Sequence, residues 1–140
     1  MERFQIVSDS SCDLGRERAK ELGVTLGSFY VSFDGENYYR EEQDITNREF
    51  YQQMADRPGV FPRTSMPTVE DYLTVLRPMV ERGEPVLCVC LNAPFSGSFQ
   101  AARNARSLLM EEFPRAEVCV LDSQLATVLQ GVLVLEAVHL

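Results

Sequence analysis

Short apolar segments that alternate with helix-like segments are the feature that most constrains the fold of this chain. Val86–Leu91 is apolar throughout, and Phe4–Ser8 and Glu117–Leu121 are mostly apolar. Strands with this composition lie in parallel sheets, because helices cover both faces of such sheets. Between the strands, apolar residues recur at helical spacing. The alternation predicts an α/β fold: a mostly parallel sheet with helices on both faces, plus a small β-hairpin.

Capping residues mark the starts of three predicted helices. Asp13 is expected to cap a helix over Gly15–Leu22. Thr46 and Glu49 have the spacing of a capping box, and Thr68 is expected to cap the helix after it. Helical spacing also predicts two inner faces, one of Phe50, Tyr51 and Met54, the other of Phe99, Ala102, Ala105, Leu109 and Phe113.

Proline and glycine mark the interruptions. Val24–Phe33 is rich in β-forming residues, and Asp34-Gly35 then predicts the tight turn of a hairpin that returns over Asn37–Arg40. Three prolines lie in Arg57–Pro67, which is therefore expected to be a loop. Pro78 falls inside the next helix and is expected to kink or break it.

The last segment, Leu125–Leu140, is apolar around nearly the whole circumference of a helix. A helix of this kind is normally buried. We therefore expect a second domain or a partner to cover it, or the chain to associate with itself. The length of 140 residues is that of one domain. We expect residues 1–140 to form a single α/β domain, the N-terminal one of a longer two-domain protein.

The charge balance argues against a nucleic-acid partner. Twenty-one acidic and 13 basic residues give a net charge of −8, and the basic residues are scattered among the acidic ones. Such a surface repels phosphate backbones. The sequence shows no secretory signal, and its apolar segments are far shorter than the roughly 20 residues that cross a bilayer. We expect a soluble, cytoplasmic protein that does not insert into membranes.

The cysteine pattern predicts reduced thiols. Cys88 and Cys90 lie on one face of a predicted strand, too parallel to bridge easily, while Cys12 and Cys119 are isolated. The chain has no C-x-x-C pair, and His139 is its only histidine. This composition disfavours a zinc site, so we expect neither a metal nor a cofactor.

The carboxyl ends of the predicted strands are the expected position of a ligand. In parallel α/β folds these ends meet at one edge of the sheet, where ligands gather. The segments placed there are Asp9–Ser11, Asn92–Ser98 and Asp122-Ser123. They are rich in hydroxyl groups and poor in catalytic groups.

Two hydroxyl-bearing segments are the candidate binding groups. Ser96, Gly97 and Ser98 lie where a helix begins, and the positive end of a helix favours an anion. Thr64 and Ser65 lie in the proline-bounded segment, which is held extended. If the two segments meet, their hydroxyls can bind one carboxylate or phosphate. The simpler interpretation makes Ser96 or Ser98 a helix cap and Thr64-Ser65 a turn.

An enzymatic alternative rests on aspartates. Asp9 and Asp122, with Asp13, are candidates to hold a metal for phosphotransfer or hydrolysis. A helix cap and a turn are simpler roles for Asp13 and Asp122. A Ser-His-Asp triad is disfavoured, because the sequence lacks G-x-S-x-G and its histidine lies in the terminal apolar segment. No P-loop is present. A regulatory interaction module is a third alternative.

Four segments form an ordered set. They are I-V-S-D-S-S-C-D at Ile6–Asp13, R-T-S-M-P-T at Arg63–Thr68, F-S-G-S-F-Q-A-A at Phe95–Ala102 and L-D-S at Leu121–Ser123. The hairpin V-S-F-D-G-E-N-Y-Y-R and the helix start D-I-T-N-R-E-F-Y belong to the same pattern. In this order and spacing, the segments resemble the DegV family of bacterial fatty-acid-binding proteins. The resemblance covers the whole chain but only the first of the family's two domains.

This resemblance implies a carrier that is not an enzyme by itself. Members of the family hold a long-chain fatty acid with its acyl chain in an apolar tunnel and its carboxyl bonded by hydroxyls. They present that carboxyl to a fatty-acid kinase for phospholipid synthesis. Position by position, the resemblance implies that Thr64 and Ser96 bond the carboxyl. It implies further donors at Ser65, Gly97 and Ser98.

The chain departs from the family's pattern near this expected ligand. Asn92-Ala93 stand where the family has two serines, Met66 replaces a common glutamine, and Ser98-Phe99 replace Thr-Tyr. Larger residues replace small ones after the last strand, namely Leu125, Val128 and Gln130. The basic residue and the histidine of the family's second domain have no counterpart here.

Overall fold

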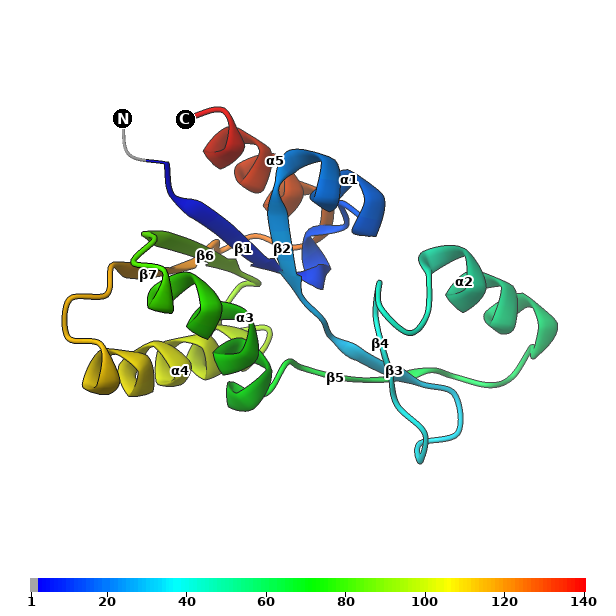
Figure 1. Cartoon of the computed structure of the whole chain (residues 1–140). Coiled ribbons are helices and arrows are strands. Elements are labelled where there is room, and N and C mark those ends of the chain that lie inside the picture. The colour runs from blue at the N-terminus through cyan, green and yellow to red at the C-terminus, as the bar shows by residue number, and fades with distance from the viewer. Residues whose placement is uncertain (1–2) are drawn as a thin grey trace.

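The main sheet has four parallel strands in the order β2-β1-β6-β7 (Figure 1). The computed structural model describes residues 3–140. The strands are β1 (Gln5–Asp9), β2 (Val24–Gly27), β6 (Val86–Cys90) and β7 (Val118–Asp122). All three neighbouring pairs are parallel, so the predicted parallel sheet is confirmed.

Helices cover both faces of this sheet (Figure 1). One face packs on α3 (Val69–Glu81) and α4 (Ser98–Glu112), the other on the short helix η1 (Ser10–Cys12), α1 (Arg16–Leu22) and α5 (Thr127–Val138). Alternation along β1 places Val7 in the first core and Ile6 in the second. The predicted inner face of α4 is confirmed: Ala102, Ala105 and Leu109 are fully buried there.

A three-stranded antiparallel sheet extends to one side of the parallel sheet (Figure 1). Its order is β4-β3-β5, with β3 at Tyr30–Ser32, β4 at Tyr39–Arg40 and β5 at Arg63–Ser65. The predicted hairpin is confirmed, since β3 pairs with β4. The Asp34 carboxylate accepts backbone N–H groups within the connecting turn. The β-rich stretch Val24–Phe33 forms two strands in the structure, β2 and β3.

The expectation of a loop over Arg57–Pro67 is wrong at its end, where β5 forms. Thr64 pairs with Val31 of β3 in antiparallel register. The three residues of β5 lie between Pro62 and Pro67, so neither proline removes a donor from the strand itself. The prolines therefore delimit the strand.

Helix α2 (Asn47–Asp56) begins at the predicted capping box of Thr46. Its predicted inner face is wrong, because no residue of this helix is buried. Tyr51 is 66% exposed and Met54 is 40% exposed. Phe50 alone makes an aromatic contact with the small sheet's hairpin, to Phe33 at 5.5 Å between ring centroids. Helical spacing predicted the apolar face correctly, but no layer of the described chain lies against it.

Two predicted helix features differ in the structure. Asp13 does not cap α1: it takes a left-handed conformation (φ 56°), and Gly15 occupies the N-cap position. The chain needs this bend to pass from the short helix η1 into α1. Pro78 does not break α3, whose start is the capping box of Thr68. A proline this close to the end of a helix removes one amide donor and leaves the earlier turns intact.

Helix α5 buries only one side of its surface. Gln130, Gly131, Val134 and Ala137 are buried. Three large apolar residues on the remaining surface stay exposed, namely Val128 at 66%, Leu129 at 61% and Val132 at 47%. Within residues 3–140 this side of α5 is uncovered, and the expectation that a second domain or a partner covers it stays a prediction.

The cysteines are free, as predicted. Cys12, Cys88 and Cys90 are buried, and Cys119 is exposed. The sulfur atoms of Cys88 and Cys90 lie 3.8 Å apart, well beyond the length of a disulfide. Within residues 3–140, none of the helices is long and apolar enough to span a membrane.

Candidate functional site

The loop between β6 and α4 holds the first candidate hydroxyl. This loop, residues 92–97, is called the Ser96 loop below. The backbone N–H of Ser96 donates to the Asn92 carbonyl at 3.2 Å, which closes the loop on itself. Ser96 Oγ accepts the backbone N–H of Ser98 at 3.2 Å. That bond uses a lone pair of the hydroxyl, so the Ser96 proton stays available to donate to a ligand.

Strand β5 brings the second candidate segment to the same place. A Cβ atom added to Gly97 would lie 2.6 Å from the Met66 sulfur, so Met66 packs directly against the Ser96 loop. Thr64 and Ser65, just before Met66, are both exposed. Met66, which follows Ser65 directly, therefore contacts the loop that carries Ser96. That Thr64 and Ser96 bind one ligand stays a prediction.

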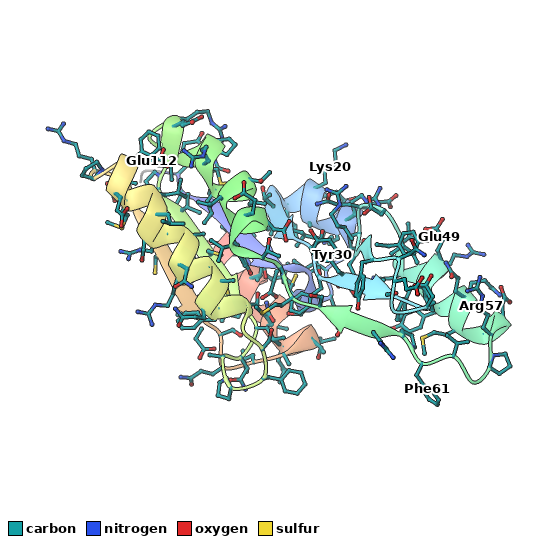
Figure 2. The ribbon with its side chains drawn as sticks, turned by 90° about the horizontal axis from the view of Figure 1, so that it is seen from below. Lys20, Tyr30, Glu49, Arg57, Phe61 and Glu112 are labelled. Carbon is teal, nitrogen blue, oxygen red and sulfur yellow. The ribbon has the colours of Figure 1, made fainter. Side chains whose placement is uncertain are left out.

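Tyr30, a residue of β3 labelled in Figure 2, anchors the small sheet to α3. The Tyr30 hydroxyl donates to Asp71 Oδ1 at 2.8 Å, and Tyr30 is the register partner of Ser65. Burial and the bond to Asp71 raise the pKa of Tyr30. Burial alone would raise the pKa of Asp71, but hydrogen bonds from Thr68 and Tyr30 outweigh it and lower that pKa. The bond links β3 to the start of α3.

Asp9, the last residue of β1, accepts four hydrogen bonds next to this loop. Its Oδ2 accepts the Leu91 N–H and the Ser98 hydroxyl, each at 2.9 Å. Its Oδ1 accepts the Gln130 amide at 2.8 Å and the Ser11 hydroxyl at 2.5 Å. The side chain is fully buried. A buried carboxylate requires such donors, so this position joins β1 to β6, α4 and α5.

The Ser98 hydroxyl lies inside the protein and not at its surface. Its proton goes to Asp9, and the Tyr72 hydroxyl lies 2.6 Å from the same oxygen. Since Ser98 has only one proton, Tyr72 donates that bond. Burial raises the pKa of the Tyr72 phenol well above its ordinary value, in keeping with a phenol that donates.

The five predicted ligand residues thus differ in their surroundings. Thr64, Ser65 and Gly97 are exposed, and Ser96 is half-buried. Ser98 is fully buried, and its side chain binds protein groups. The interpretation of Ser96 or Ser98 as the helix cap is wrong, because Gly97 holds the N-cap position of α4, although Ser96 Oγ accepts the first amide of that helix. Thr64-Ser65 form a strand and not a turn.

Sequence reasoning missed Tyr72 and Gln130. Helical spacing places Tyr72 on the apolar face of its helix, and its hydroxyl gave no signal of a partner. Gln130 did give a signal, because it is the single amide side chain in the apolar segment Leu125–Leu140. In the structure it is fully buried and donates to Asp9 and to Ser8, at 2.8 and 3.1 Å.

The enzymatic alternative depends on Asp9 and Asp122. Both oxygens of Asp9 are occupied by internal donors. Asp122 Oδ1 accepts the backbone N–H groups of Ala93 and Gln124, at 3.1 and 3.0 Å. Among the residues that the structure describes, no group of three or more His, Cys, Asp or Glu side chains could hold a metal ion. The hydrogen bonds by which they hold neighbouring loops give both aspartates a structural role.

Four surface cavities open elsewhere on the described chain. Their volumes are about 610, 410, 490 and 380 Å³. None of the four is lined by Thr64, Ser65 or the Ser96 loop. Thr64 and Ser65 are exposed at the surface, and Ser96 is half-buried.

Comparison with known proteins gives the family. The profile described as "Uncharacterised protein, DegV family" matches residues 3–140. The chain belongs to the DegV family. A DegV domain-containing protein of Clostridium acetobutylicum is 32% identical over 120 residues, which are 86% of this chain and 41% of the relative. One from Halalkalibacterium halodurans is 34% identical over 110 residues, 78% of this chain and 38% of the relative.

Solved DegV structures share the fold. The crystal structure of a "fat acid (stearic acid)-binding protein" from Eubacterium ventriosum is 48% identical with a TM-score of 0.93, over 98% of this chain and 47% of that one. A structure described as fatty acid binding of a DegV family protein from Thermus thermophilus is 35% identical with a TM-score of 0.79, over 98% and 46%. The predicted family and fold are confirmed, and the chain spans about half the length of these relatives.

Proposed function

We propose that this DegV chain binds a long-chain fatty acid, whose carboxyl group is held by the hydroxyls of Thr64 and Ser96. The observation that carries the proposal is the contact between Met66 and Gly97. It brings an exposed strand and a helix-start loop together at the carboxyl edge of the sheet. Ser65 and Gly97 lie at the same contact and supply neighbouring donors. Ser98 contributes indirectly, because its side chain binds Asp9 and its backbone N–H binds Ser96 Oγ.

The donors fit a carboxylate in both charge and number. Ser96 keeps its proton free, as described above, and Thr64 lies exposed on β5. The N-terminus of α4, which has 15 residues, adds the partial positive charge of its unpaired amides. A hydrogen bond to a charged group contributes about 1.5–3 kcal/mol. A lone carboxylate can therefore be oriented here without a basic residue from this chain.

The acyl chain supplies most of the binding free energy in this proposal. Each buried CH₂ contributes roughly 0.8 kcal/mol, so a long chain gives on the order of 10 kcal/mol before ordering costs. The acyl chain would run in an apolar tunnel completed beyond this chain. In support, Phe95 of the Ser96 loop is 79% exposed, and Leu129 of α5 is 61% exposed. The tail then sets the affinity, and the hydroxyls set the orientation.

The same apolar surface supports the proposed domain organisation. We propose that residues 1–140 form a single α/β domain, the N-terminal one of a longer two-domain protein. The relatives are about twice as long as this chain, and the exposed side of α5 is the surface such a domain would cover. Without that cover, self-association through α5 is the expected behaviour.

The cellular role in this proposal is that of a carrier and not of an enzyme by itself. The bound fatty acid is presented to a fatty-acid kinase, which activates the carboxyl for phospholipid synthesis in the cytoplasm. Within residues 3–140, the Thr64 and Ser96 hydroxyls have no His, Asp or Glu side chain as a hydrogen-bond partner, which suits a protein that holds a carboxylate while another protein reacts with it. A net charge of −8 also suits a carrier that does not bind nucleic acid.

Mass spectrometry of an organic extract tests the proposal directly. The protein expressed from its complete reading frame should contain fatty acid near one equivalent. Ser96→Ala should retain the lipid yet slow its phosphorylation by the kinase, because the head group is misplaced. Ser107→Ala is the matched control, since that hydroxyl bonds only its own helix. An empty protein that also fails to take up added fatty acid would contradict the proposal.

A further inference from the structure

Asp9 holds the Ser96 loop by both of its ends. The loop starts after Leu91 and ends before Ser98. Asp9 Oδ2 accepts the Leu91 N–H at 2.9 Å and the Ser98 hydroxyl at 2.9 Å. A single oxygen atom therefore receives one hydrogen bond from the residue before the loop and one from the residue after it.

The second of these bonds leads directly to the ligand hydroxyl. The residue whose side chain bonds Asp9, Ser98, is also the residue whose backbone N–H donates to Ser96 Oγ at 3.2 Å. The position of the Ser96 oxygen thus depends on where Ser98 lies. Ser98 in turn is held by Asp9 on one side and by the Tyr72 hydroxyl, 2.6 Å away, on the other.

The other carboxylate oxygen keeps Asp9 itself in place. Oδ1 accepts the Gln130 amide at 2.8 Å and the Ser11 hydroxyl at 2.5 Å, and Ser11 Oγ also lies 2.9 Å from Gln130 Oε1. All of these donors are neutral. Because Asp9 is fully buried, solvent does not compete for its oxygens, and the hydrogen bonds alone fix its orientation.

We infer that Asp9 is a positioning residue for the carboxyl site. It does not touch the ligand; it holds Ser98, and through Ser98 it aims the Ser96 hydroxyl at the ligand carboxylate. This inference rests on the proposed function, because the orientation of the Ser96 hydroxyl matters only if that hydroxyl binds the ligand. In this role, Asp9 gives the site its preference for a ligand with a carboxylate over a ligand whose head group is uncharged.

The test compares two ligands that differ only in the head group. Dissociation constants for octadecanoic acid and its methyl ester are measured on the protein from its complete reading frame. Wild type should prefer the acid. Asp9→Asn and Ser98→Ala should each reduce that preference about tenfold, the effect of one hydrogen bond to a charged group. Ser98→Thr, which retains the hydroxyl, and Ser107→Ala should keep the wild-type preference.

A double variant shows whether Asp9 acts through Ser96. In a Ser96→Ala background, Asp9→Asn should change the acid-over-ester preference by less than twofold, because the hydroxyl it aims is gone. Hydrogen exchange of residues 92–97 in the ligand-free protein should be faster in Asp9→Asn than in wild type. If Asp9→Asn yields no folded protein, Ser98→Ala and Ser98→Thr decide the question in the same assays.

The outcomes separate this inference from the proposed function. Equal weakening of acid and ester in Asp9→Asn, or an undiminished effect in the Ser96→Ala background, would overturn the positioning role and leave fatty-acid binding intact. Wild-type protein that binds neither ligand, or binds both equally, would overturn the proposed carboxyl site, and the positioning role with it.

Discussion

Replacing Gly131 by alanine tests how closely α5 approaches the short helix η1. Gly131 lies in the middle of α5, and a Cβ added there would lie 2.4 Å from the Cys12 carbonyl oxygen. Carbon and oxygen normally stay about 3.3 Å apart at closest. The substitution therefore pushes α5 or the Cys12 backbone away by roughly 1 Å, set by the same contact distance.

Two opposing terms decide the size of this effect. Gly131 is not among the glycines with positive φ, so alanine suits its helical backbone and would add about 1 kcal/mol of helix stability. Overpacking a well-packed core costs about 1–3 kcal/mol, and the upper end applies because the contact is with backbone and not with a flexible side chain. We expect a net loss of about 2 kcal/mol.

Urea unfolding measures this loss. At a slope of about 2 kcal/mol per molar, the midpoint for Gly131→Ala should fall by about 1 M. Val132→Ala is the matched control: this neighbour is 47% exposed, so its loss should stay within about 0.5 kcal/mol. A Gly131→Ala protein that is more stable than wild type would refute the reasoning, since helix propensity would then outweigh the contact.

Two further predictions concern stability at the helix starts and at the hairpin turn. Thr68→Ala should lower the free energy of unfolding by about 1 kcal/mol, because its capping box begins a helix that packs in the core. Thr46→Ala removes the same motif from a helix without buried residues, and it should instead speed local hydrogen exchange. Equal losses in urea unfolding would contradict this difference. The side-chain amide of Asn37, followed by backbone N–H groups of Asn37 and Glu36, holds the pKa of Asp34 well below its usual value. A lowered carboxyl pKa stabilises the fold above about pH 4, and that contribution is lost as the pH falls. Asp34→Asn should therefore lose less stability than wild type between about pH 4 and pH 2, and parallel acid-unfolding curves for the two proteins would contradict the assignment.

Local pattern was enough to predict much of the fold. The apolar run at Val86–Leu91 became the central strand β6, and the two capping boxes start α2 and α3. The Asp34-Gly35 turn closes the predicted hairpin. These features depend on neighbours within a few residues, and such short-range chemistry is written in the sequence directly.

Two of the errors concern what lies against an element. The apolar face of α2 was identified correctly, but Tyr51 remains 66% exposed because, within residues 3–140, no other element covers it. Strand β5 was missed because three residues between prolines carry no period of their own. Pairing with β3, about 30 residues earlier in the chain, makes them a strand. Long-range pairing of this kind overrides local preference.

In the candidate site, too, some features follow from local sequence and others depend on packing. The sequence by itself determined that hydroxyl-bearing segments follow the strands, that α4 begins beside Ser96, and that the motifs are those of the DegV family. Only the tertiary structure decided that Met66 packs on Gly97 and that Asp9 binds both ends of the Ser96 loop. The physical reason is that a hydrogen bond between residues about 90 positions apart depends on how strands and helices are stacked. Periodicity shows that a side chain is buried, whereas the packed layers decide which atom it meets.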